Sequence, residues 1–207
     1  MSDRKKVKIA VLVSGGGTNL QALIDAEARG ELHSGTIALV VSNNPDAYAL
    51  TRAADAGIDA LTLTRKDCGS QEAFEETLHE TLLARGIDLI ILAGFMSILG
   101  KLFTDRWPER ILNVHPALIP SFCGKGFYGL RVHQAALDYG VKVTGATVHY
   151  VNEVPDGGRI ILQKAVEIQD GDTPEILQKR VMEQAEWILL PQAAELVSAK
   201  IAKENDK

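Results

Sequence analysis

Short runs of β-branched and aliphatic residues alternate along this chain with longer segments of helical periodicity. Parallel strands joined by crossover helices produce this alternation. Strands are predicted at Val7–Val13, Thr36–Ser42, Ala60–Leu63, Leu89–Leu92, Ile111–Val114, Lys142–Val151 and Ile160–Glu167. Helices are predicted at Asn19–Arg29, Ala47–Ala56, Ser70–Arg85, Lys101–Asp105, Val132–Asp138 and Pro174–Ala199. The pattern predicts an α/β fold of three layers, with a mixed, mainly parallel sheet and helices on both faces.

The last two predicted strands have no helix between them. They are joined by Asn152–Gly158, a short segment rich in turn residues, which predicts an antiparallel hairpin at one side of the sheet. No linker rich in proline, glycine or serine divides the chain. We therefore expect a single domain over residues 1–207, with residues 203–207 as a disordered tail.

Charge and composition restrict the class of partner. The net charge is −5, and lysine and arginine are scattered without a cluster, which argues against a nucleic-acid surface. The first apolar stretch, Ile9–Val13, is too short for a signal peptide or a membrane span. A cytoplasmic protein without a membrane partner is expected. Its cysteine, histidine and acidic residues form no metal-binding motif, so no metal is expected.

A glycine-rich segment, Ser14-Gly15-Gly16-Gly17-Thr18-Asn19, follows the first strand and precedes a helix. Glycines let backbone N–H groups approach an anion, and the helix N-terminus adds partial positive charge. The segment lacks the lysine of a P-loop and the third glycine of a dinucleotide site. It indicates a seat for a phosphate monoester, or a glycine turn that serves only the strand-to-helix corner.

A second motif lies where the strand Ile111–Val114 runs into His115-Pro116. Side chains alternate along a strand, so Asn113 and His115 project from the same side. Ligands of open α/β sheets bind beyond the carboxyl ends of the strands, where the glycine segment also lies. An amide beside an imidazole suits an oxyanion, because both can donate to one developing negative charge. The alternative is that both side chains only bond loop backbone.

The third motif is the hairpin loop itself, with Asp156 followed by Gly157 and Gly158. Asp-Gly is first a turn signal. A catalytic role needs the Asp156 carboxylate to lie near an imidazole. The carboxylate would then raise the pKa of the imidazole and could take up protons through a bridging water.

With these motifs in order, the sequence resembles the phosphoribosylglycinamide formyltransferases over nearly its whole length. The resemblance is carried by Val11–Leu23, by Leu92-Ala93-Gly94-Phe95-Met96, by Asn113–Pro120 and by Asp156-Gly157-Gly158. It implies a Rossmann-like sheet of the formyltransferase type. It also implies transfer of a formyl group from 10-formyltetrahydrofolate, as donor co-substrate, to the primary amine of glycinamide ribonucleotide in de novo purine biosynthesis. A monomer or a homodimer is expected.

The resemblance also implies roles for individual residues. Asn113, His115 and Asp156 would be catalytic, and Gly16, Gly17, Thr18 and Asn19 would hold the substrate phosphate. The folate would lie between Met96-Ser97-Ile98-Leu99 and the hairpin loop with Asn152 and Pro155. A glutamate of the last helix would meet the substrate amine: counting back from Pro191 gives Glu186, and counting forward from Arg180-Val181 leaves Glu183 open.

Three positions depart from the family pattern. Ser97 stands where an arginine is frequent, the segment 121–129 is longer than usual and is interpreted as a flap, and Arg159 replaces a frequent proline. Two alternatives to the transferase stay open. One is a formyltetrahydrofolate hydrolase, in which water replaces the amine, and the other is a nucleotide-binding module without catalysis.

Overall fold

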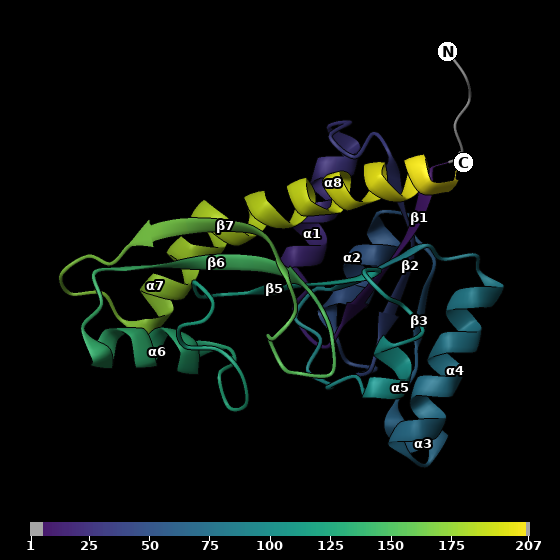
Figure 1. The fold of residues 1–207 in the computed structure, drawn as a ribbon, viewed down its shortest axis with the longest axis horizontal. Coiled ribbons are helices and arrows are strands. Elements are labelled where there is room, and N and C mark those ends of the chain that lie inside the picture. The colour runs from purple at the N-terminus through teal and green to yellow at the C-terminus, as the bar shows by residue number, and fades with distance from the viewer. Residues whose placement is uncertain (1–5, 206–207) are drawn as a thin grey trace.

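The computed structural model of the protein describes residues 6–205, and within them seven strands form one sheet in the order β3-β2-β1-β4-β5-β6-β7 (Figure 1). The strands are β1 Val7–Val13, β2 Gly35–Ser42, β3 Ala60–Thr62, β4 Leu89–Leu92, β5 Ile111–His115, β6 Val143–Tyr150 and β7 Ile160–Glu167. The first five pair in parallel, whereas β6 is antiparallel to both β5 and β7. The mixed, mainly parallel sheet and the terminal hairpin predicted from the sequence are confirmed.

The helices are α1 Thr18–Ala28, α2 Tyr48–Asp55, α3 Arg65–Cys68, α4 Gln71–Ala84, α5 Lys101–Thr104, α6 Leu130–Tyr139, α7 Pro174–Val181 and α8 Trp187–Asn205. A π-helical turn, Met182–Glu186, lies between the last two. Five of the six predicted helices are confirmed within two residues at each end. Helix α3 was not predicted, because it has only four residues and no apolar period; it begins where the Thr64 side chain accepts a bond from the Asp67 N–H.

Two apolar cores lie on opposite faces of the sheet, because alternate residues of a strand point to opposite sides. On β1, Ile9 and Val11 pack into the core formed with α1 and α8. Ala10 and Leu12 pack into the other core, with Phe74 of α4. The central strands are therefore apolar on both faces, as expected for a sheet covered by helices on both sides.

The strand order reverses at β1, so the carboxyl end of β1 is the expected place for a ligand. The chain passes from β1 to β2 and β3 on one side, then returns to place β4 on the other side of β1. Loops that leave the strands on either side of such a reversal diverge, and ligands bind in the space between them. The glycine loop, residues 14–17, leaves β1 at this point.

The end of the chain differs from its prediction in two respects. The predicted helix Pro174–Ala199 is interrupted by the π-helical turn, and its last segment continues to Asn205. Residues 203–205 are therefore helical and not part of a disordered tail, while residues 206–207 lie outside the described part. Ile201 is buried and Glu204 pairs with Arg110 at 2.9 Å, which holds the last turn in place.

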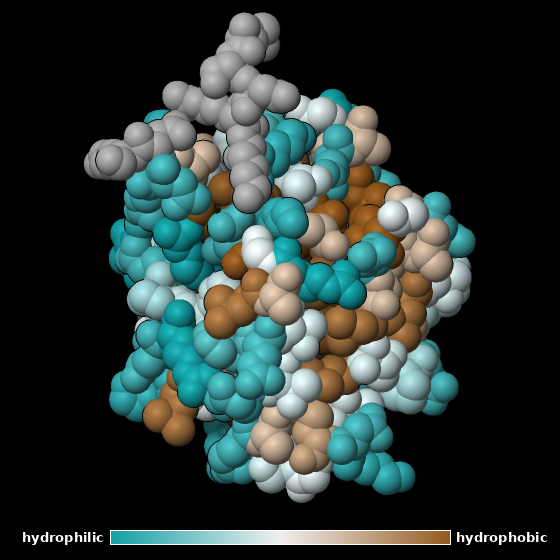
Figure 2. All heavy atoms as spheres, turned by 90° about the vertical axis from the view of Figure 1, so that its right-hand side faces the viewer, coloured by the Kyte–Doolittle hydropathy of each residue, from teal (hydrophilic) through white to brown (hydrophobic). Residues whose placement is uncertain are grey.

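The short strand β3 forms one edge of the sheet. Figure 2 shows this end of the molecule, where hydrophilic and apolar side chains are mixed at the surface.

Within residues 6–205, no helix combines the length and the apolar character that a membrane span requires.

Candidate active site

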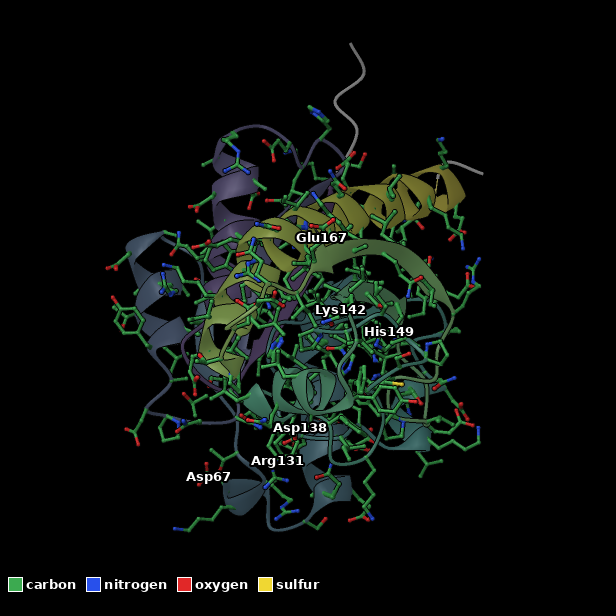
Figure 3. The ribbon with its side chains drawn as sticks, turned by 90° about the vertical axis from the view of Figure 1, so that its left-hand side faces the viewer. Asp67, Arg131, Asp138, Lys142, His149 and Glu167 are labelled. Atoms are coloured by element: carbon green, nitrogen blue, oxygen red, sulfur yellow. The ribbon has the colours of Figure 1, made fainter. Side chains whose placement is uncertain are left out.

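Asn113 and His115 lie on one face of β5, as their alternation predicts, and a third polar residue joins them from β6. Asn113 is the cross-strand partner of His149, so the two side chains share a face. The Asn113 Nδ2 lies 3.2 Å from the His149 Nε2. Figure 3 looks at the end of the hairpin that carries Lys142 and Glu167, and it also labels His149 of β6.

Asp156 completes the cluster because the hairpin loop folds back over β5 and β6. Its Oδ2 lies 3.5 Å from the His115 Nδ1, and its Oδ1 lies 3.6 Å from the His149 Nε2. Asp156 has a left-handed backbone with a φ of 56°, a conformation that aspartate tolerates better than most residues. The three residues predicted to act together are thus brought together, with His149 beside them.

The flap, residues 121–129, covers this cluster and bonds to it twice. The His115 Nε2 lies 2.9 Å from the Phe122 carbonyl oxygen. Because a carbonyl only accepts, Nε2 carries the hydrogen, and the Nδ1 of His115 is left to face Asp156. The Gly124 N–H donates to the Asp156 Oδ2 at 2.8 Å.

The charges of the cluster follow from burial and from these contacts. Burial lowers the pKa of His115, although the Asp156 carboxylate and the Phe122 carbonyl favour the protonated ring. Burial alone would raise the pKa of Asp156, but the nearby imidazoles of His149 and His115 and the bond from the Gly124 N–H hold that pKa below its usual value. Asp156 is therefore a carboxylate at neutral pH, and His115 is an imidazole that a nearby negative charge would help to protonate.

His149, which belongs to none of the three motifs of the sequence, also lies within the cluster. Its Nδ1 lies 2.7 Å from the Tyr150 carbonyl oxygen, so Nδ1 carries a hydrogen and the Nε2 of a neutral ring accepts from Asn113. The signal in the sequence was the alternation in Thr147-Val148-His149. It could not identify a partner, since the register of β6 on β5 was unknown.

The glycine loop presents free N–H groups at the start of α1. Gly17 is the N-cap of α1, with a φ of 71° and no side-chain cap. Among residues 6–205, no acceptor receives the backbone N–H groups of residues 16–19. The Ser14 Oγ accepts from the Met96 N–H at 2.8 Å, which joins the loop to the segment that follows β4. Gly16, Gly17, Thr18 and Asn19 thus form a set of donors at the start of α1, unpaired within the described part of the chain.

The two glutamates left open by the sequence point in different directions. Glu186 is buried and accepts from the Asn19 Nδ2 at 2.8 Å. Glu183 is exposed and lies 3.9 Å from the Lys179 ammonium group. Residues three apart would share a face of an α-helix, but the wider π-helical turn rotates them apart. Glu183 and Glu186 therefore lie on different faces of this helical segment.

Burial is the largest influence on Glu186. It raises the pKa of the Glu186 carboxyl to about 7, and the bond from Asn19 only partly offsets it. A carboxyl with such a pKa exchanges its proton near neutral pH. The Asn19 Oδ1 is also buried and has no partner among the described residues.

The segment predicted to hold the folate is only partly available. Met96 and Ile98 are exposed, and the Ser97 Oγ accepts from the Asn43 Nδ2 at 2.8 Å. Leu99 is buried in the core with Phe103, so its side chain cannot line a surface site. Asn152 and Pro155 lie in the loop that carries Asp156, and the Asn152 Oδ1 accepts from the Val154 N–H at 3.0 Å.

No three histidine, cysteine, aspartate or glutamate side chains within the described part of the chain are placed to hold a metal ion. The chemistry that the cluster offers is a pair of donors, the Asn113 amide and the His115 imidazole, beside a fixed carboxylate. Such an arrangement can stabilise a negative oxygen and move a proton.

Comparison with known proteins gives one consistent picture. The family model described as Formyl transferase matches residues 7–193. The phosphoribosylglycinamide formyltransferase of Haemophilus influenzae is 43% identical over 177 residues, which cover 86% of this chain and 81% of that protein. The crystal structure of glycinamide ribonucleotide transformylase 1 from Symbiobacterium toebii has a TM-score of 0.88 at 42% identity, covering 94% of this chain and 89% of that chain.

A longer relative is also similar. The trifunctional purine biosynthetic protein adenosine-3 of Gallus gallus is 44% identical over 194 residues, 94% of this chain. The chain spans only 19% of the length of that protein.

Proposed function

The chain belongs to the formyl transferase family, within the phosphoribosylglycinamide formyltransferases, and from this premise we propose that it moves the formyl group of 10-formyltetrahydrofolate to the primary amine of glycinamide ribonucleotide. This reaction is a step of de novo purine biosynthesis. The observation that carries the proposal is the convergence of Asn113, His115 and Asp156, at the same edge of the sheet as the glycine loop. We also propose a cytoplasmic location and a monomer or homodimer.

The reaction is an acyl transfer. The amine nitrogen attacks the formyl carbon, and the π electrons of the carbonyl move onto its oxygen. The bond between the formyl carbon and N10 then breaks, and the amine proton passes to N10. The Asn113 amide and the His115 Nε2–H stabilise the negative oxygen. One such donor lowers the barrier of the reaction by about 3 to 4 kcal/mol.

The bond between His115 and the flap supports a place for the formyl oxygen. The Phe122 carbonyl oxygen accepts from the His115 Nε2 at 2.9 Å. The formyl oxygen of the donor would replace it, which exchanges one carbonyl acceptor for another. Asp156, on the other side of the ring, would stabilise the imidazolium and relay the amine proton through water.

The nucleotide would lie between the glycine loop and the last helices. Its phosphate would accept the N–H groups of Gly16, Gly17, Thr18 and Asn19 at the N-terminus of α1, where partial positive charge favours an anion. Its amine would contact the Glu186 carboxylate, which lies next to Asn19. A carboxyl with a pKa of about 7 can accept a proton from the amine, which must be neutral to attack.

The folate would lie between residues 96–99 and 152–158, with N10 near His115. The exposed Met96 and Ile98 would form an apolar wall for the pterin, and the hairpin loop with Asn152 and Pro155 would form the opposite side. Leu99 would contribute backbone only, since its side chain is buried.

One assay separates this function from its alternatives. The purified protein is incubated with 10-formyltetrahydrofolate, with and without glycinamide ribonucleotide, and free tetrahydrofolate and formylated nucleotide are measured. We expect tetrahydrofolate only when the amine is present, in equal amount to the formylated nucleotide. Tetrahydrofolate released equally without the amine would indicate a hydrolase. Protection against heat by ribonucleotide but not by a folate analogue would indicate a nucleotide-binding module.

A further inference from the structure

Helix α2 holds the glycine loop through two consecutive carbonyl groups. The Ala49 N–H donates to the Gly15 oxygen at 3.0 Å, and the Arg52 Nε donates to the Gly16 oxygen at 2.8 Å. The packing is close, because a Cβ placed on Gly17 would lie 2.6 Å from the Cβ of Ala49. The loop therefore has little freedom to rotate these peptide groups.

These two bonds also set the direction of the loop N–H groups. In a trans peptide the carbonyl of one residue and the N–H of the next point in opposite directions. Since the Gly15 and Gly16 carbonyls face α2, the N–H groups of Gly16 and Gly17 face away from it. Within residues 6–205 neither N–H has an acceptor. Helix α2 thus turns two donors away from itself and leaves them free for a ligand.

Arg52 is the side chain that links this loop to α1. Its Nη1 donates to the Gln21 Oε1 at 2.8 Å, and the Gln21 Nε2 donates to the Asp25 Oδ1 at 2.9 Å. Its guanidinium carbon lies 5.0 Å from the centre of the Tyr48 ring. Two hydrogen bonds and the contact with the Tyr48 ring hold the planar fork of the Arg52 guanidinium in place. A flexible lysine ammonium could not make the same set of contacts.

We propose that Arg52 is the positioning residue for the substrate phosphate, an inference that rests on the proposed function. By holding the Gly16 carbonyl toward α2, Arg52 keeps the Gly17 N–H aimed at the phosphate. Its charge next to the loop offsets the charge of the dianion. The residue acts through the loop and contacts neither the formyl group nor the amine.

The test compares substrates with and without the phosphate. Arg52→Met should lower kcat/KM for glycinamide ribonucleotide about tenfold, the effect of one lost bond to a charged group, mainly through KM. For glycinamide ribonucleoside, which has no phosphate, the variant and the wild type should agree. The matched control is Arg85→Met, which removes the same charge from an arginine that pairs with Asp59 at 2.8 Å. An equal loss on both substrates, or no loss on either, would overturn the proposal.

Two further variants cover the case in which Arg52→Met does not fold. Arg52→Lys keeps the charge without the fork, and Gln21→Ala removes one partner of the fork; both should raise KM for the phosphorylated substrate alone. A lysine variant equal to wild type would contradict a positioning role. Inorganic phosphate provides a readout that does not depend on the reaction: it should raise the melting temperature of wild type and of Arg85→Met, and raise that of Arg52→Met less. This result would stand even if no formyl transfer were observed.

Discussion

Both ring nitrogens of His115 have a polar neighbour. The Nε2 donates to the Phe122 carbonyl of the flap, and the Nδ1 faces the Asp156 carboxylate. Replacement by alanine removes the bond to the Phe122 carbonyl and leaves Asp156 with His149 and the Gly124 N–H. The ring contacts Phe122 and Asp156, and the ligand seats proposed at the glycine loop and at residues 96–99 come from other segments. The side chain should therefore matter for turnover more than for binding.

We expect His115→Ala to lower kcat about 100- to 1,000-fold, the loss of one oxyanion donor. Dissociation constants for glycinamide ribonucleotide and a folate analogue, measured by calorimetry, should change less than threefold. Asn113→Ala should behave alike, and the double variant should lose little more than either, because both act on one oxygen. Near-normal turnover of His115→Ala would remove the imidazole from the mechanism.

At the scale of elements, the π-helical turn Met182–Glu186 is the feature with the most direct effect on the site. A π-helical turn holds one residue more than an α-helical turn. The sequence left the choice between Glu186, counted from Pro191, and Glu183, counted from Val181, open. In the structure both lie in this turn, where Glu186 is buried and Glu183 is exposed.

Glu186→Gln and Glu183→Gln form a matched pair that tests this arrangement. The first should raise KM for the nucleotide about tenfold, because an amide cannot take a proton from the amine or pair with its charge. It should not lower the melting temperature, since a carboxyl with a pKa of about 7 is half neutral at that pH. The second should change both quantities little, since an exposed ion pair contributes less than about 1 kcal/mol. The reverse result in steady-state kinetics would assign the amine to Glu183.

At the scale of the whole molecule, a buried histidine links stability to pH. His133 of α6 is fully buried, and neither ring nitrogen has a partner among the described residues. Burial, with a smaller contribution from the nearby His115, lowers the pKa of His133 to about 4. Between that value and the ordinary pKa of about 6.5, the unfolded chain binds a proton that the folded protein does not, so stability falls as pH falls.

When the pH falls from 7 to 5, we expect the lowered pKa of His133 to decrease the free energy of unfolding by about 2 kcal/mol. Urea unfolding at the two pH values measures it, and His133→Leu should show that much less loss than wild type. His33→Leu is the control, because His33 is exposed and should leave the pH dependence unchanged. Equal pH dependence in His133→Leu and wild type would show that the ring is protonated in the folded protein.

The sequence was sufficient for the features that depend on local pattern. All seven strands lie where β-branched and aliphatic runs predicted them. For β1, β4 and β5 the reason is that a buried parallel strand needs such residues on both faces. The common face of Asn113 and His115 follows from alternation within one strand. The glycine loop at the start of α1 was also predictable, because a left-handed φ such as that of Gly17 favours glycine.

Other features required contacts between distant segments. His149 meets Asn113 only in the observed register of β6 on β5, and a shift of one residue would turn it to the other face. Leu99 points into the core because of how its segment packs under Phe103, which no local period indicates. The folding of the hairpin loop that brings Asp156 to His115 likewise follows from its bond to the flap.

The sequence by itself thus determined the succession of strands and helices along the chain, the glycine loop and the chemical types of the reacting groups. These features depend on periodicity and on backbone requirements, which are properties of neighbouring residues. The tertiary structure alone decided that Asp156 and His149 join His115, that Glu186 and not Glu183 faces inward, and that Arg52 holds the glycine loop. The physical reason is that these contacts join residues far apart in the chain, and their geometry exists only once the sheet and its helices have packed.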